Sequence, residues 1–189
     1  MDTKLLFLLT ALIFWLFACD KIPEPTQANI DTPVEIQIQT TVDAEITLKK
    51  FIDASITRQH SEYYDLLSEK DRAIKTREKY LEEQQQLQPN LADNYFHDIT
   101  YQISAITLSG NNASAEVIYH FPDAERMIKQ VYNLAILEKQ GLPALDEMKQ
   151  QMDIAFKDKP LPMKTITRHF NLLQENNNWR VYMGWDKQQ

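Results

Sequence analysis

The sequence predicts an α+β fold in which helices pack on one face of a curved antiparallel sheet, with a helical insertion between two hairpins. Three observations lead to this prediction. Apolar residues recur every three or four positions between residues 41 and 87, which is the spacing of amphipathic helices. The spacing then changes to every second residue in two paired segments, 98–121 and 165–185, each interrupted by an asparagine-containing turn. Helical spacing returns between these two segments.

The composition is typical of one globular domain and excludes several function classes. The 189 residues include 25% charged and 43% hydrophobic side chains, with a formal net charge of −7. A chain this acidic lacks the basic surface that neutralises phosphates, so no nucleic-acid partner is expected. The single cysteine excludes an intrachain disulfide and a multi-thiolate metal site, and three glycines are too few for a glycine-rich phosphate loop.

The N-terminal segment has the features of a secretion signal. From residue 5 to residue 18 every side chain but one is apolar, a run shorter than the ~20 residues of a spanning helix. The segment Leu16-Phe17-Ala18-Cys19 resembles the lipobox of bacterial lipoproteins, with Phe17 bulkier than is usual there. The resemblance implies a cleaved signal peptide over 1–18 and acylation of Cys19. The alternatives are an ordinary signal peptide and a short transmembrane anchor with an incidental cysteine.

Acylation at Cys19 would attach the chain to a lipid bilayer. Each buried CH₂ contributes ~0.8 kcal/mol, so two or three acyl chains hold a protein firmly on a membrane. Asp20 resembles the signal that retains enterobacterial lipoproteins in the inner membrane. We therefore expect a lipid-anchored protein with its domain in the periplasm, and the inner membrane is favoured.

Residues 19–42 are expected to form the lipidated cysteine and a flexible tether. Pro23, Pro25 and Pro33 among threonine, glutamine, asparagine and aspartate favour extended chain. The segment Val34–Thr40 alternates apolar and polar residues, so it is either a short edge strand or loop, and we expect loop.

Three helices are predicted to follow the tether. The first runs from Thr41 to about His60 and has a one-sided apolar stripe. The second, Glu62–Ser68, begins after Ser61, which is a suitable N-cap residue. The third, Asp71–Leu87, is highly charged and is expected to lie on the surface.

Two hairpins and an insertion are predicted for the rest of the chain. The first hairpin pairs Asp98–Leu108 with Ala113–Phe121, and the second pairs Thr165–Glu175 with Trp179–Trp185. One face of the first strand is expected to contain Ile99, Tyr101, Ile103 and Ala105. Between the hairpins, Ala124–Lys157 is expected to form two helices, with Gly141 ending the first and Pro143 in the first turn of the second. Met127, Met148, Met152, Met163 and Met183 resemble Cu(I) ligands in type, but Met148 and Met152 fall on the apolar stripe of a helix, so we expect core packing.

The order of these elements resembles the nuclear-transport-factor-2-like, or cystatin-like, superfamily. Three stretches are similar to that family: Ser61–Ser68, Gly110–Val117 and Glu175–Tyr182. The resemblance covers Asp43–Asp186 and implies a single α+β domain over residues 43–189. It also implies a pocket between the helices and the sheet, which the insertion could cap or block.

Enzymes of this superfamily, such as ketosteroid isomerase and scytalone dehydratase, place acid or base residues in that pocket. The candidates in this chain are His97 with Asp98, His120, His169, Tyr101 and Tyr119. Neighbours on a strand point to opposite faces, so His97 and Asp98 do not simply form a dyad. Solvated or half-buried sheet residues are the favoured interpretation, and we assign no catalytic residue, cofactor or metal site. Possible pocket-lining residues are Tyr101, Tyr119, Phe170 and Trp179, for which packing on the sheet face is the alternative.

Three functions are compatible with the sequence. The first is a non-catalytic, membrane-anchored binding or scaffolding domain that recognises a protein partner or a small apolar ligand. The second is a pocket enzyme of the isomerase, dehydratase or hydrolase type, which needs two titratable residues in one enclosed apolar cavity. The third is a subunit of an envelope secretion or conjugation assembly.

Overall fold

The computed structural model describes residues 34–87, 95, 97–132, 141 and 143–187, which form two compact units. The sheet unit contains the described residues of Cys19–Leu87, Tyr101–Tyr119 and Thr167–Gln189. The helical unit contains those of Gln88–Thr100 and His120–Ile166. The predicted signal peptide and Cys19 lie outside the described residues, and the extent of a single domain over 43–189 stays a prediction.

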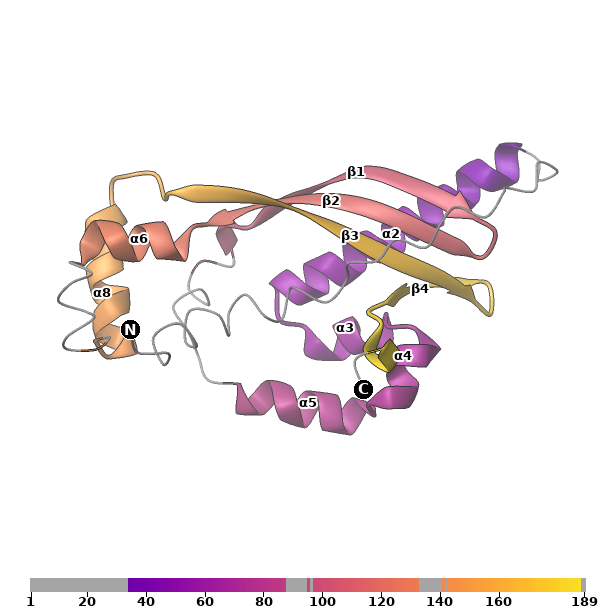
Figure 1. The fold of residues 1–189 in the computed structure, drawn as a ribbon, viewed down its shortest axis with the longest axis horizontal. Helices are drawn as coiled ribbons and strands as arrows, with labels where there is room; N and C mark the ends of the chain where they lie inside the picture. Colours follow the sequence, from indigo (N-terminus) through magenta and orange to yellow (C-terminus); the bar gives the residue numbers. More distant parts are fainter. Residues whose placement is uncertain (1–33, 88–94, 96, 133–140, 142, 188–189) are drawn as a thin grey trace. The chain divides into compact units, whose positions relative to one another are not determined.

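The predicted fold class is confirmed. Four strands form one antiparallel sheet in the order β1-β2-β3-β4: β1 (Thr100–Ser109), β2 (Asn112–Pro122), β3 (Met163–Glu175) and β4 (Asn178–Tyr182). In the sheet unit, the helices α2 to α5 lie on one side of this sheet (Figure 1). The helices α6 and α8 come between β2 and β3 in the chain, so the insertion between the two hairpins is also confirmed.

The long helix α2 (Val34–Ile56) corrects two predictions. It begins at Val34, so Val34–Thr40 is neither edge strand nor loop, and the last part of the predicted tether is helical. Alternation over this length is typical of a strand, but these residues directly precede a strong helix, and extending an existing helix adds one hydrogen bond for each residue fixed. The helix also ends earlier than predicted, because the chain turns at Arg58 with a φ of 57°.

The two helices predicted next are shorter than expected. The first, α3 (His60–Asp65), includes Ser61 within the helix instead of at its cap. It stops there because the following residues join β4: Ser68 N–H donates to the Val181 carbonyl at 2.8 Å, and Val181 N–H donates to Leu66 at 2.9 Å. These bonds depend on residues more than a hundred positions apart, which local spacing does not reveal.

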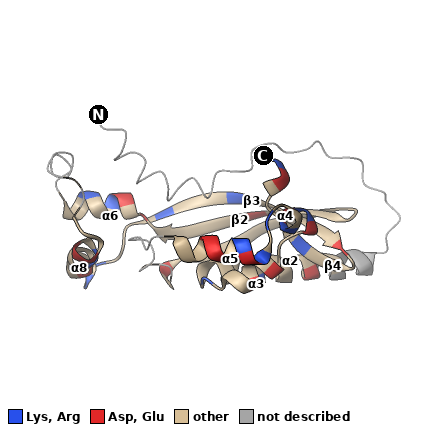
Figure 2. Cartoon of the chain, turned by 90° about the horizontal axis from the view of Figure 1, so that it is seen from below, with Lys and Arg blue, Asp and Glu red and all other residues tan. Residues whose placement is uncertain are grey.

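The predicted helix Asp71–Leu87 is divided in two, α4 (Glu69–Ile74) and α5 (Arg77–Gln86). Ser68 caps α4 by accepting from Asp71 N–H, and Thr76 caps α5 by accepting from Lys79 N–H. Helix α5 is largely exposed, as predicted, and acidic and basic residues are interspersed along it (Figure 2).

The hairpins form where they were predicted, with changes at their ends. Strand β1 starts at Thr100 instead of Asp98, and its alternation shifts by one position in the middle, which leaves Ala105 exposed. Its half-buried residues are Tyr101, Ile103, Ile106 and Leu108. The last strand, β4, stops at Tyr182 and is followed by a short 3₁₀ helix, η2 (Trp185–Lys187).

The core of the sheet unit lies between α2 and the inner face of the sheet. Leu48, Phe51 and Ile52 from α2 are at most 2% exposed. They belong to one cluster with residues of α3, α5 and all four strands. The apolar stripe predicted for α2 therefore has the expected position.

The helical unit has a separate core rich in methionine. Helices α6 (Ala124–Val131) and α8 (Leu145–Phe156) bury Met127, Met148 and Met152 together with Tyr95. The predicted core packing is confirmed for these three methionines, but it was wrong for Met163, which is 42% exposed at the start of β3. Predicted helical residues at 134, 135 and 137 lie outside the described part, and α8 begins at Leu145 instead of at Pro143. None of the described helices is long and apolar enough to cross a membrane.

Candidate functional site

Three of the four predicted pocket residues come together under α2. The ring centroids of Tyr101 and Tyr119 are 6.1 Å apart, and those of Tyr119 and Phe170 are 6.5 Å apart. Phe51 of α2 completes the group at 6.1 Å from Phe170, in an edge-to-face arrangement. We call these four residues the aromatic cluster. The fourth predicted residue, Trp179, makes none of these ring contacts and is buried in the core.

The strand pattern explains why these rings meet. Tyr101, Tyr119 and Phe170 stand on the face of β1, β2 and β3 that packs against the core. Neighbouring strands lie about 4.8 Å apart, so inward residues at matching positions on adjacent strands touch. Phe51 reaches the same place because it lies on the buried stripe of α2.

Two charged residues border the aromatic cluster. The hydroxyl of Tyr101 donates to Asp53 Oδ1 at 2.8 Å, and Asp53 is exposed on α2. Burial, followed by the hydrogen bond to Asp53, raises the pKa of Tyr101 above its usual value. Burial also raises the pKa of Tyr119, which the Arg168 guanidinium on β3 partly offsets. Both hydroxyls stay protonated at neutral pH, so neither acts as a base, and that of Tyr101 is a hydrogen-bond donor.

This arrangement places packed aromatic rings beside two charged side chains. Phe51 is only 2% exposed and the other three rings are half-buried against the core, while Asp53 and Arg168 supply one charge of each sign. Partial burial lowers the pKa of Arg168, but a guanidinium remains charged in proteins. Sequence spacing predicted the tyrosines, whereas Asp53 and Arg168 had no signal that distinguished them from other surface charges.

The predicted histidine candidates are not brought together. His97 lies before β1 and contacts Asp98 at 3.1 Å, with its side chain 75% exposed. These two residues are not on a strand, so the expectation that they point to opposite faces was wrong. His120 Nδ1 lies 2.8 Å from the Thr165 hydroxyl on the exposed face, and His169 is exposed. Among the described residues, no three His, Cys, Asp or Glu side chains gather as metal ligands would.

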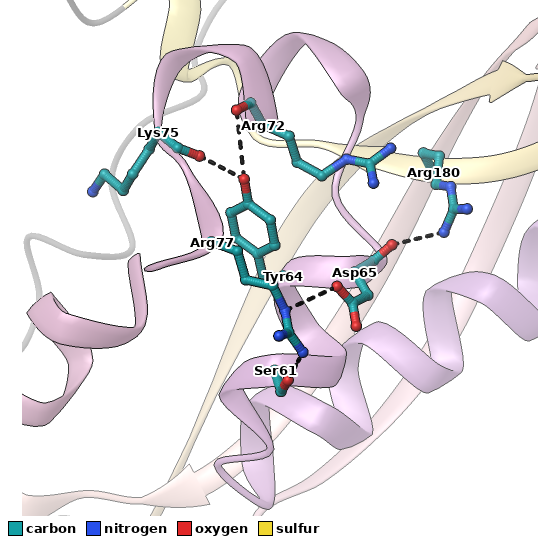
Figure 3. A network of polar contacts seen from close by, with 7 residues as sticks. All are labelled: Ser61, Tyr64, Asp65, Arg72, Lys75, Arg77 and Arg180. Carbon is teal, nitrogen blue, oxygen red and sulfur yellow. Dashed lines mark hydrogen bonds and ion pairs between the residues drawn. The ribbon is translucent and has the colours of Figure 1, made fainter. Parts of the chain in front are cut away.

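A polar network that the sequence did not predict joins α3, α4, α5 and β4 (Figure 3). The carboxylate of Asp65 pairs with Arg77 Nε at 3.3 Å, and its backbone carbonyl accepts from Arg180 at 2.7 Å. The Tyr64 hydroxyl donates to the carbonyl of Lys75 at 2.6 Å. These contacts tie the ends of three helices to the last strand, so their role is structural.

The fully buried Asp71 was also missed by sequence reasoning. Its carboxylate accepts from the backbone N–H groups of Met183 and Trp185, each at 2.8 Å, and from the Ser68 hydroxyl at 2.7 Å. Its sequence neighbours are charged and give no indication of burial. This carboxylate fixes the segment after β4 onto α4.

A shallow hollow follows the exposed side of α8 in the helical unit. Its lining consists of Asp146, Lys149, Gln150, Asp153, Ile154 and Lys157. None of the four predicted pocket residues belongs to it. The hollow is open and charged, which is unlike the enclosed apolar cavity that acid–base chemistry needs.

Comparison with known proteins assigns no relative to the chain. No protein-family model matches the sequence, and no curated protein matches it either.

Proposed function

We propose that this protein is a membrane-anchored periplasmic lipoprotein with a non-catalytic binding or scaffolding domain. Its aromatic cluster would recognise a protein partner or a small apolar ligand. The observation that supports this proposal is the convergence of Phe51, Tyr101, Tyr119 and Phe170 beside Asp53 and Arg168. Protonated tyrosines and a single exposed carboxylate suit binding better than proton transfer.

The proposed anchor is Cys19, in the segment that resembles a lipobox. Between Cys19 and the start of α2 at Val34 there are residues 20–33. Fourteen residues span at most about 50 Å when fully extended. The domain would then act close to the membrane surface, and Asp20 favours the inner membrane.

Site-specific photocrosslinking in the native host tests the binding proposal. A benzophenone amino acid placed at Tyr101 or Tyr119 should give covalent adducts with a partner or a ligand. The matched control is the same amino acid at Lys79, which is exposed on α5 away from the aromatic cluster. Adducts at Lys79 equal to those at the two tyrosines would contradict binding at the cluster, and so would no adducts at all.

The same adducts distinguish the subunit hypothesis. An adduct that co-purifies with a multi-subunit envelope complex would assign the domain to a secretion or conjugation assembly. A discrete adduct with one protein or one small molecule would favour a separate binding protein.

A further inference from the structure

The two edges of the sheet differ in how they are protected. Strand β4 is covered on its outer side by Leu66–Ser68, which forms a parallel bridge between Leu67 and Val181. Strand β1 forms the opposite edge, and among the described residues no other strand pairs with its outer side (Figure 1). An unpaired edge presents a row of N–H and C=O groups to a further strand.

Strand β1 lacks the usual features that prevent edge pairing. Its ten residues, Thr100–Ser109, contain no charged residue and no proline. Proteins commonly protect long edges with lysine, proline or short strands, and typical strands have only five or six residues. This edge is thus suited to accept another strand.

The burial pattern of β1 identifies which strand fits best. The ten residues alternate between exposed and half-buried in an order that is identical when read from either end of the strand. An antiparallel pairing of two β1 strands with full overlap would place Tyr101 opposite Leu108 of the second copy and Ile103 opposite Ile106. It would also place the exposed Gln102 opposite the exposed Thr107. Cross-strand partners share a face of the sheet, so every position in this register matches in burial.

The central shift in alternation makes this register possible. In a regularly alternating strand, full overlap of ten residues would pair inward with outward positions. Here Ser104 and Ala105 are both exposed at the centre, so each half of β1 matches the other half of a second copy.

Helix α2 provides exposed apolar surface beside the open edge of β1. Val42 and Ile46 are 43% and 46% exposed, and they share a helical stripe with Asp53. The hydrogen bond from Tyr101 to Asp53 places this stripe on the flank of α2 that faces β1. The N-terminal end of α2 lies at the same end of the sheet as the β1–β2 turn, so α2 and β1 run in opposite directions (Figure 1).

Twofold pairing of β1 would make the two α2 helices antiparallel across the axis. Asp43 and Glu45 come before Ile46, and Lys49 and Lys50 follow it. Glu45 and Lys49 form an ion pair within one helix at 2.6 Å, so their charges are already matched in each copy. Val42 and Ile46 of the two copies would meet near the axis.

We infer that β1 pairs antiparallel with β1 of a second copy of this chain, extending the sheet across a twofold axis. The pairing combines a free uncharged edge, a self-matching burial pattern and the exposed Val42 and Ile46. It does not depend on the proposed ligand site.

Register-specific disulfide formation tests this pairing. Full-length chains in detergent carry Cys19→Ser, so that only introduced thiols react. Chains with Gln102→Cys and chains with Thr107→Cys are then mixed and oxidised. The mixture should give disulfide-linked dimers, whereas either chain alone should give little, because positions 102 of the two copies are five residues out of register. The matched control mixes Ser114→Cys with Thr167→Cys, both exposed on central strands, and should give no dimers.

Three outcomes would overturn the inference. They are no dimers in the 102/107 mixture, a dimer yield from either chain alone that equals that of the mixture, and a yield from the control mixture that equals it. Sedimentation of the full-length Cys19→Ser chain gives an independent measurement. Ala105→Lys places like charges beside the axis and should raise the dimer dissociation constant about fivefold or more. Ser114→Lys should leave that constant unchanged. An unsubstituted chain that stays monomeric, or equal effects of the two lysines, would contradict the pairing.

Discussion

Removing the buried carboxylate of Asp71 is predicted to be among the most damaging single changes in the sheet unit. The side chain is 0% exposed and accepts three hydrogen bonds, from Met183 N–H, Trp185 N–H and the Ser68 hydroxyl. A buried donor left without its acceptor costs about 1–3 kcal/mol. The two backbone donors are only partly buried and regain some bonding to water. We therefore expect Asp71→Ala to lower the free energy of unfolding by about 3–5 kcal/mol.

Asp71→Asn separates the loss of bonds from the loss of volume. The amide keeps one acceptor oxygen but turns an NH₂ group toward a backbone donor, so an intermediate loss of about 1–3 kcal/mol is expected. Urea unfolding followed by tryptophan fluorescence measures both variants, because Trp179 and Trp185 both lie in the sheet unit.

With a urea slope of about 2 kcal/mol/M, Asp71→Ala should lower the unfolding midpoint by about 2 M. The control is Glu82→Ala, an exposed acidic residue on α5, which should change stability by less than about 0.5 kcal/mol. An Asp71→Ala chain within 1 kcal/mol of the parent at an unchanged slope would refute this account of the carboxylate.

Three further changes test other parts of the molecule. Cys19→Ser should abolish labelling with radioactive palmitate and release the protein from membranes, without altering its circular dichroism; continued labelling would contradict the lipid anchor. Burial, and then Arg58, lower the pKa of His60, so the folded state favours the neutral imidazole. Its contribution to stability should be complete above pH 6.5 and decrease as the pH falls below that value, and His60→Gln should remove this dependence in unfolding measured from pH 8 to pH 5. Met152→Ala should destabilise the helical unit by about 2–5 kcal/mol, seen as faster hydrogen exchange in α6 and α8, because Met152 is fully buried.

The sequence predicted those elements whose determinants are local. The hairpins are predictable from apolar residues at every second position and from short turns. In the turn between β3 and β4, Asn176 and Asn177 adopt φ values of 50° and 63°. The apolar faces of α2 and α8 follow from helical spacing. By contrast, α3 ends at Asp65 because the next three residues pair with β4, and no local signal marks that contact.

The residues of the candidate site also divide into those with local determinants and those placed by distant contacts. Tyr101, Tyr119 and Phe170 were predictable because alternation alone assigns each to a face of its strand. Asp53 was not, because it reaches Tyr101 only when α2 crosses β1, and their sequence separation is 48 residues. Asp71 resembles any surface acid until the chain after β4 returns to it.

The different protection of the two sheet edges bears on the size of the proposed assembly. A free edge on both sides would allow copies to add without limit, as in fibres. In this chain, Leu66–Ser68 occupies the outer side of β4, and Asp71 holds the chain after β4 against α4. The first part of β3, Met163–Phe170, also has no partner strand on that side, because β4 pairs only with Asn171–Glu175, but this stretch carries Lys164 and Arg168. Among the described strands, β1 is then the only open edge without charges, so edge pairing should stop at two copies. Loss of the Asp71 bonds would loosen the covering of β4, and Asp71→Ala chains should therefore form species larger than dimers before they unfold. Sedimentation in increasing urea distinguishes these outcomes: if Asp71→Ala passes directly from dimer to unfolded monomer, the covering of β4 does not limit assembly.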